Sequence, residues 1–239
     1  MSISRSTPLI AADGRLSMRN PAALIDHTLL RPDATEARII QLCEEAVEYG
    51  FAAVCIPPLF VPLAAERLYG SAVSVGTVVG FPCGYNATRH KVLEAREAAA
   101  RGAAELDMVI AVGQALSGHI AYVADEIAQV VLAAAEARVK VILECCYLDH
   151  DLMAELTEVV VRCGAAYVKT STGFGPAGAR AEDVRILART AAGRVGVKAA
   201  GGIRDLDGCR RMLEAGATRI GTSAGIEIVS QWQAAHPSP

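Results

Sequence analysis

Three lysines lie in short apolar runs, where a charged side chain is costly to bury. The chain has four lysines against nineteen arginines, and three of the four directly follow a valine, at Lys140, Lys169 and Lys198, spaced 29 residues apart. Arginine keeps its proton in proteins, whereas a buried lysine can lose its proton and act as a nucleophile. These positions therefore predict a reactive amine inside the protein.

Carboxylates occur in comparable apolar runs. Asp107 lies in the run Glu105–Ile110, and Asp26 lies in an earlier run. Because side chains alternate along a strand, Glu144 shares one side of its run with Lys140. Three lysines and three acids at such positions favour a common chemical site. The structural alternative is a buried ion-pair network that fixes the register of the strands.

Two glycine-rich turns follow apolar runs near the end of the chain. They read Ala200-Gly201-Gly202-Ile203-Arg204 and Ile220-Gly221-Thr222-Ser223-Ala224-Gly225. Turns of this kind that lead into helices direct backbone N–H groups at an anion, and the last two loops of an alternating barrel commonly bind phosphate. The alternative is that the glycines only form the turns. Two such loops together favour a phosphate site.

Other candidate residues have an equally good structural explanation. His27 is either catalytic or a core histidine with its hydrogen bonds satisfied. Cys55 ends an apolar run, and it either faces the site or packs as a small apolar side chain. Cys145, Cys146 and His150 do not have the spacing of a zinc site, so we predict no bound metal.

The elements that must position these residues alternate regularly. Glycines mark four similar helix-to-strand junctions, about two strand-plus-helix units apart, at Gly50, Gly102, Gly164 and Gly216. Amphipathic patterns such as Ala37–Tyr49 and Val184–Ala192 predict helices, and Thr88 is a predicted N-cap. We predict eight strands, near residues 24–30, 52–56, 72–80, 105–110, 140–144, 167–171, 195–200 and 219–223.

Eight alternating units predict an α/β fold, a closed (β/α)8 TIM barrel in a single domain. An open doubly wound sheet is the alternative, but the G-x-G-x-x-G turn expected after its first strand does not follow Leu24–Leu30. We expect residues 1–20 to form an N-terminal extension and residues 21–239 to form the barrel. The three lysines then occupy adjacent strands, with Lys140 lower than the other two, and the active site lies at the C-terminal ends of the strands.

Composition narrows the class of function. The 239 residues are 52% hydrophobic and 21% charged, enough for a large core. The net charge of -3, with both signs interspersed, argues against a nucleic-acid or anionic-membrane partner and favours a small-molecule ligand. No run is long and apolar enough to cross a bilayer. Seven cysteines without a C-x-x-C pair indicate a reducing compartment, so we expect a cytoplasmic protein.

Six segments form a joint pattern along the chain. They are Leu24-Ile25-Asp26-His27-Thr28-Leu29-Leu30, Val79-Gly80-Phe81-Pro82, Glu105-Leu106-Asp107-Met108-Val109-Ile110, Lys140-Val141-Ile142-Leu143-Glu144, Val168-Lys169-Thr170-Ser171-Thr172-Gly173-Phe174 and Val197-Lys198-Ala199-Ala200-Gly201-Gly202-Ile203-Arg204. In this order they resemble the deoxyribose-phosphate aldolase family. The resemblance runs from about Leu24 to Gly225, nearly the whole predicted barrel.

The resemblance implies a class I aldolase, which reversibly cleaves 2-deoxy-D-ribose 5-phosphate into acetaldehyde and D-glyceraldehyde 3-phosphate through a lysine imine, without metal or other cofactor. It implies that Lys169 forms the Schiff base, that Asp107 donates or accepts protons and that Lys198 is the second catalytic lysine. It also implies that Cys55 lines the pocket and that the phosphate is bound by Gly173, Gly201, Gly202, Gly221 and Ser223. We expect a homo-oligomer, with a dimer favoured.

Two positions depart from the family's pattern. Ala111 stands where the family commonly has asparagine, which removes a polar contact. The segment Ala235–Pro239 lacks the terminal tyrosine that some members use in proton transfer, which affects the expected proton shuttle and turnover rate. Two alternative functions stay open: an imine-forming aldolase for another phosphorylated sugar, and a non-catalytic barrel that binds a sugar phosphate.

Overall fold

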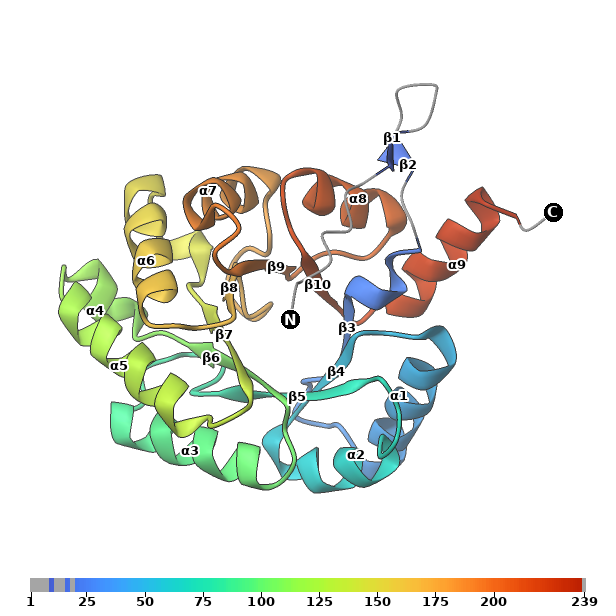
Figure 1. Cartoon of the computed structure of the whole chain (residues 1–239), viewed down its shortest axis with the longest axis horizontal. Helices are drawn as coiled ribbons and strands as arrows, with labels where there is room; N and C mark the ends of the chain where they lie inside the picture. Colours follow the sequence, from blue (N-terminus) through green and yellow to red (C-terminus); the bar gives the residue numbers. More distant parts are fainter. Residues whose placement is uncertain (1–8, 11–15, 18–19, 238–239) are drawn as a thin grey trace.

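The structure, a computed structural model, describes residues 9–10, 16–17 and 20–237, and within them eight parallel strands close into a barrel (Figure 1). The last strand pairs with the first, so the sheet has no free edge. The predicted (β/α)8 barrel is therefore confirmed. Its strands are β3 (Ile25–Thr28), β4 (Ala53–Ile56), β5 (Ser74–Val79), β6 (Glu105–Val109), β7 (Arg138–Ile142), β8 (Tyr167–Lys169), β9 (Gly196–Ala200) and β10 (Arg219–Thr222).

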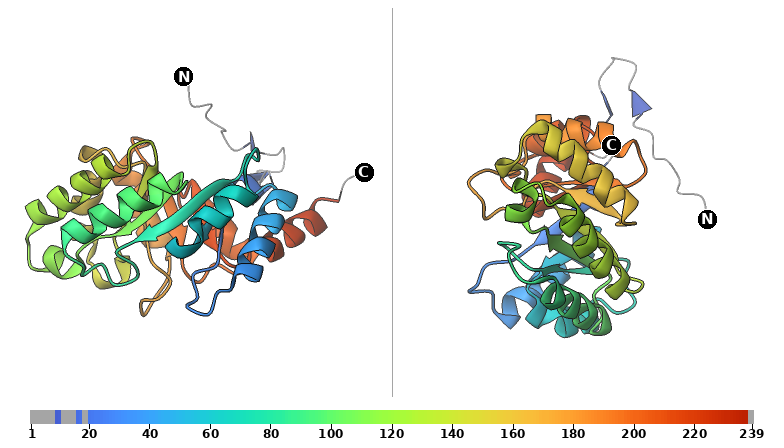
Figure 2. Two further views of the ribbon diagram at one scale, coloured as in Figure 1. Left: turned by 90° about the horizontal axis from the view of Figure 1, so that it is seen from below. Right: turned by 90° about the vertical axis from the view of Figure 1, so that its left-hand side faces the viewer.

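Helices surround the barrel and connect its strands (Figures 1 and 2). In α1 (Glu36–Tyr49), Ile39, Leu42, Cys43 and Ala46 recur at helical spacing and are buried, so one face packs on the sheet. The other helices are α2 (Val61–Arg67), α3 (Thr88–Ala100), α4 (Val112–Leu116), α5 (Ile120–Ala133), α6 (His150–Arg162), α7 (Ala181–Ala191), α8 (Leu206–Glu214) and α9 (Gly225–Ala235). Short 3-10 helices are η1 (Pro21–Leu24), η2 (Pro58–Phe60) and η3 (Cys145–Tyr147).

Several predicted details differ from the structure. Thr88 is not an N-cap but the first residue of α3, after Ala87, and its hydroxyl donates to the Tyr122 hydroxyl at 3.1 Å instead of capping the helix. The strand predicted over 140–144 ends at Ile142, and Glu144 takes a left-handed turn conformation with a φ of 56°. The polar residues after the strand therefore belong to a loop at the barrel's C-terminal end.

The predicted N-terminal extension falls mostly outside the described residues. Within it, β1 (Leu9–Ile10) pairs antiparallel with β2 (Leu16–Ser17). The side chain of Asn20 accepts a hydrogen bond from the Ala22 backbone at the start of η1. The division into residues 1–20 and 21–239 stays a prediction.

The apolar core lies between the strands and the helices rather than inside the barrel. Leu106 and Met108 of β6 and Val141 of β7 are fully buried in this layer. Because side chains alternate along a strand, the residues between them point into the barrel, and there the chain places Asp107 and Lys140. Branched apolar side chains usually fill that space in barrels of this kind. Here charged side chains such as Asp107 and Lys140 occupy part of it.

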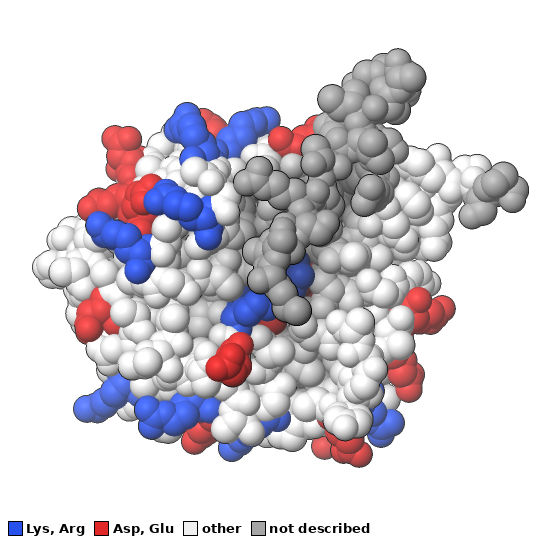
Figure 3. Space-filling view, viewed as in Figure 1, with Lys and Arg blue, Asp and Glu red and all other residues white. Residues whose placement is uncertain are grey.

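Charges of both signs are scattered over the face of the molecule seen in Figure 3. Among the described residues, every helix is too short or too polar to span a bilayer. On the left of Figure 2, the loop that follows β3 and the loop that follows β8 extend on the same side of the barrel. This is the C-terminal end of the strands, where active sites of such barrels lie.

Candidate active site

A cavity of about 610 Å³ opens at the C-terminal end of the barrel. Loops after β3, β8, β9 and β10 line it, together with one face of α1. A volume of this size suits a small-molecule ligand. Six of the predicted site residues line the cavity, and these are Lys169, Gly173, Gly201, Gly202, Gly221 and Ser223.

Lys169 lies at the floor of the cavity, as the last residue of β8. In the sheet it is aligned with Ile142 of β7 and Lys198 of β9. The side chain is only 3% exposed, and its Nζ donates to Oδ2 of Asp107 at 2.7 Å. A buried strand end thus presents one amine to the cavity while a carboxylate holds it from below.

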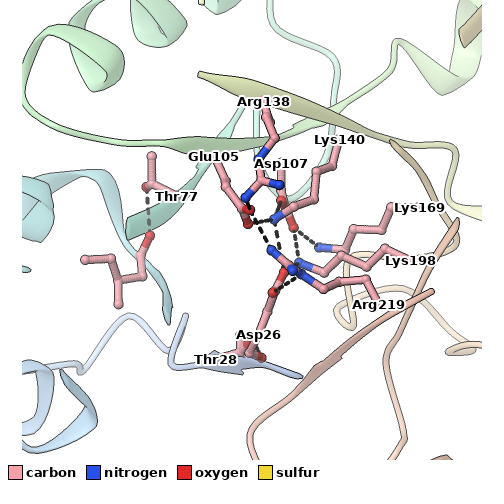
Figure 4. A network of polar contacts seen from close by, with 11 residues as sticks. Asp26, Thr28, Thr77, Glu105, Asp107, Arg138, Lys140, Lys169, Lys198 and Arg219 are labelled. Atoms are coloured by element: carbon pink, nitrogen blue, oxygen red, sulfur yellow. Dashed lines mark hydrogen bonds and ion pairs between the residues drawn. The ribbon is translucent and has the colours of Figure 1, made fainter. Parts of the chain in front are cut away.

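Asp107 is the centre of a buried network beneath the cavity (Figure 4). Its Oδ2 accepts from Lys169 and Lys198, each at 2.7 Å, and its Oδ1 accepts from Lys140 at 3.0 Å. Since Lys169 and Lys198 both bond this oxygen, the distance between their Nζ atoms cannot exceed the sum of the two 2.7 Å hydrogen bonds. The structure therefore brings together the three residues predicted to be catalytic, although Asp107 and Lys198 lie below the cavity wall.

Two further carboxylates complete the network. Asp26 accepts from Lys198 at 2.5 Å, from Arg219 at 2.6 Å and from Lys140 at 3.0 Å. Glu105 pairs with Lys140 at 2.5 Å and with Arg219 at 2.5 Å. Lys140 is aligned with Asp107 and Tyr167, one layer below Lys169, as the sequence predicted.

Sequence reasoning missed Glu105 and Arg219. Glu105 stands two residues before Asp107, so the period of two that placed Lys140 and Glu144 on one side would also have placed Glu105 beside Asp107. Arg219 begins β10 in alignment with Lys198. An arginine at the first position of a predicted strand resembles a surface residue in the sequence, and its acidic partners on β3 and β6 come within reach only in the closed barrel.

Glu144 is not part of this network, so its grouping with the lysines was wrong. Its carboxylate accepts from the Thr172 backbone at 3.2 Å and from the Thr172 hydroxyl. This contact ties the loop after β7 to the loop after β8, where Thr172 lines the cavity. Ala111 is buried at the start of α4 and does not line the cavity.

The surrounding charges shift the pKa values of the three lysines in different directions. Burial lowers the pKa of Lys169, the charge of Lys198 lowers it further, and Asp107 opposes both. Burial also disfavours the charged forms of Lys140 and Lys198, but the neighbouring carboxylates outweigh it and raise the pKa of each. Burial would protonate Asp107, yet the lysines hold the pKa of its carboxyl well below the ordinary value. Lys169 is thus the lysine of this network that most readily loses its proton.

The glycine-rich loops are packed closely against each other and against the lysines. A Cβ on Gly221 would lie 2.9 Å from Cε of Lys198, and a Cβ on Gly201 would lie 2.9 Å from Cα of Gly178. The Thr222 hydroxyl donates to the Ile203 carbonyl at 2.6 Å and so joins the loops after β9 and β10. Glycine at these positions leaves room for backbone and lysine atoms that a side chain would displace.

Cys55 and His27 lie at the margin of the site. Cys55 is 1% exposed and does not line the cavity; burial, followed by the charge of Asp107, raises the pKa of its thiol to about 11. His27 lines the cavity, and its Nε2 bonds Glu45 of α1 at 2.8 Å. Burial lowers the pKa of His27, which favours the neutral ring. In the part of the chain that the structure describes, no three His, Cys, Asp or Glu side chains gather where they could hold a metal ion.

Comparison with known proteins finds relatives by sequence and by structure. The model of a family described as DeoC/LacD family aldolase matches residues 22–231. A deoxyribose-phosphate aldolase of Syntrophotalea carbinolica is 53% identical over 218 residues, covering 91% of this chain and 99% of that protein. One from Thermus thermophilus is 50% identical, covering 87% and 95%. The tetrameric structure of the deoxyribose phosphate aldolase from Aeropyrum pernix has a TM-score of 0.83 and 35% identity, covering 90% of this chain and 91% of that chain.

Proposed function

This chain belongs to the DeoC/LacD family of aldolases, and on that premise we propose that it is a class I aldolase for 2-deoxy-D-ribose 5-phosphate. As a carbon–carbon lyase it would form acetaldehyde and D-glyceraldehyde 3-phosphate reversibly. One observation carries the proposal. Of the three lysines in the barrel interior, Lys169 alone lines the cavity, and it alone has a lowered pKa.

The reaction begins with neutral Lys169. Its Nζ attacks C1 of the open-chain sugar to give a carbinolamine, which loses water and becomes a protonated imine. The C2–C3 bond then breaks, its electron pair moves toward the imine nitrogen to form an enamine, and the C3 hydroxyl gives up its proton as glyceraldehyde 3-phosphate leaves. Protonation of the enamine at C2 and hydrolysis release acetaldehyde and restore the amine.

Asp107 and Lys198 are assigned to the proton transfers. Asp107 is ionised because the lysines depress the pKa of its carboxyl, so its Oδ2 can accept a proton near Lys169. Asp107 and Asp26 raise the pKa of Lys198 against burial, so Lys198 carries the proton that a relay through Asp107 would use. Oδ2 of Asp107 is thus the proton acceptor, and it is hydrogen-bonded both to Lys198 and to the Lys169 nitrogen that reacts.

The phosphate is assigned to Gly173, Gly201, Gly202, Gly221 and Ser223, all on the cavity wall. Ser223 lies two residues before α9, so the positive end of that helix dipole supports an anion beside it. Binding the phosphate far from the reacting carbons would align the C2–C3 bond with Lys169. Cys55 is assigned only to the shape of the site, since it lies behind the wall.

Gly202 offers a direct test of the phosphate assignment. A Cβ at Gly202 would meet no atom within 4 Å, and its φ of 77° is one that asparagine and aspartate tolerate. We expect Gly202→Asp to lower kcat/KM for deoxyribose 5-phosphate relative to unphosphorylated deoxyribose by about tenfold more than Gly202→Asn does, because only the carboxylate repels the phosphate. Steady-state kinetics on both sugars measure the ratio.

Equal losses for the two sugars in both variants would mean that these loops only support the fold. Gly221 is less suitable, because a side chain there would press on Lys198 and reduce turnover of either sugar.

The reaction itself is tested by incubating the protein with deoxyribose 5-phosphate and measuring acetaldehyde. Release of acetaldehyde supports the proposal. Cleavage of a different phosphorylated sugar instead would support the alternative aldolase, and binding of deoxyribose 5-phosphate without cleavage or imine trapping would support a non-catalytic barrel.

Two properties outside the site remain proposals. We propose a homo-oligomer, with a dimer favoured, and the relative from Aeropyrum pernix described as tetrameric supports self-association. We also propose a cytoplasmic location, which the seven cysteines support because all are free thiols in the structure.

A further inference from the structure

The barrel interior holds balanced numbers of buried charges when Lys169 is left out. Three carboxylates face three cations, and these are Asp26, Glu105 and Asp107 with Lys140, Lys198 and Arg219. Arg138 also pairs with Glu105, but its side chain is 48% exposed, so water screens its charge. A proton on Lys169 would add a fourth buried cation without a carboxylate of its own.

We infer that Lys140 and Glu105, which do not line the cavity, are positioning residues whose buried charges set the protonation state of Lys169. The inference rests on the proposed function, because the neutral amine matters only if Lys169 is the nucleophile. Lys140 and Glu105 act through Asp107 and through space, and neither touches the substrate.

Short contacts through Asp107 connect Lys140 and Glu105 to Lys169. Lys140 is fully buried, and its Nζ is 3.0 Å from Oδ1 of Asp107, while Lys169 is 2.7 Å from Oδ2 of the same carboxylate. Glu105 is fully buried, and its Oε2 is 2.5 Å from Nζ of Lys140. Without the charge of Lys140, Asp107 and Glu105 would lack one cation, and Lys169 is the nearby group that can supply it by taking up a proton.

Charged groups on several strands contribute to this balance. Lysine and arginine lie on β7, β9 and β10, acids lie on β3 and β6, and β4 contributes a thiol that its raised pKa keeps neutral. The buried titratable groups of the barrel interior around Lys169 are Asp26, Cys55, Glu105, Asp107, Lys140, Lys198 and Arg219, and of these Asp107, Lys198 and Cys55 act on Lys169 directly. Among them, Lys140 and Glu105 form a pair that can be removed together without changing the net charge.

The test is the pH dependence of imine formation at Lys169. Each protein is exposed briefly to acetaldehyde and cyanoborohydride at a series of pH values, and the ethylated Lys169 peptide is measured by mass spectrometry. Lys140→Met should move the midpoint up by about one pH unit, and Glu105→Gln should move it down by a similar amount. The double variant should return close to the wild-type midpoint, and Lys140→Arg, which keeps the charge, should stay there.

Each outcome separates this inference from the proposed function. Equal midpoints in all variants would overturn the charge balance, as would a double variant that stays shifted like Lys140→Met. If the wild-type protein forms no Lys169 adduct at any pH, the proposed function itself is contradicted. If Lys140→Met does not fold, the downward shift in Glu105→Gln and its reversal in the charge-neutral double variant decide the question.

Discussion

Lys169→Met is expected to abolish cleavage of deoxyribose 5-phosphate, with kcat falling by at least about 10⁴-fold, because Lys169 is the one lysine among the described residues that lines the cavity and could form the imine. Lys169→Arg should be equally inactive, since the guanidinium keeps its charge and cannot attack a carbonyl. Acetaldehyde release measures the loss, and borohydride reduction in the presence of acetaldehyde should leave an ethyl group on Lys169 in the wild-type protein only.

The methionine variant should stay folded, which separates lost chemistry from lost structure. The lowered pKa of Lys169 means that the folded state disfavours its proton. This cost to stability is present at neutral pH and disappears only as the pH rises toward the unfolded pKa of lysine. An apolar side chain removes that cost, so the melting temperature should not fall. An ethyl group found on Lys140 or Lys198 instead would overturn the assignment of the nucleophile.

Replacing Lys198 should reduce turnover by about 10²-fold or more, because the residue is assigned to proton transfer. It should also change the pH dependence of imine trapping at Lys169. In Lys198→Met the repulsion of Lys169 disappears, and Asp107 loses one of its partners and attracts the Lys169 proton more strongly. Both effects raise the pKa of Lys169, so trapping should shift to higher pH.

Lys198→Arg is the matched variant. It keeps a positive charge beside Asp107 but cannot release a proton, so it should turn over poorly while its trapping curve stays closer to that of wild type. If wild type and both variants follow one pH curve, the charge of Lys198 has no part in activating Lys169. Burial, the largest cause of the lowered pKa of Lys169, would then act without help from Lys198.

The fold and the nucleophile could be predicted because both leave local patterns. Eight apolar runs and repeated glycine junctions define the barrel, and a lysine inside an apolar run is unusual enough to attract notice. The fourth lysine shows the limit of that signal. Lys91 lies in a polar helical segment, yet it is fully buried and bonds Glu126 and the Val109 carbonyl at 2.8 Å each. Its burial depends on how α3 packs against α5, which no local pattern records.

The partners in the barrel interior were harder to predict for a related reason. Which carboxylate meets which lysine depends on the stagger of the strands around the closed barrel, so alternation along one strand can place Glu105 with Asp107, or Glu144 with Lys140, without revealing their partners. Arg219 acquires its partners only because β10 returns to β3. The residue types in each strand can be read from the sequence, whereas these ion pairs also depend on how neighbouring strands are aligned in the barrel.

The ion pairs inside the barrel also bear on how the chain folds. They join residues far apart in sequence: 193 positions separate Asp26 from Arg219, 172 separate Asp26 from Lys198 and 114 separate Glu105 from Arg219. Such contacts can form only after distant strands have met, so we expect them to form late in folding. Weakening them should therefore accelerate unfolding and leave the refolding rate nearly unchanged. The ion-pair network that shifts the pKa of Lys169 would then also slow the unfolding of the barrel, because its contacts must be lost before the unfolding transition state is reached.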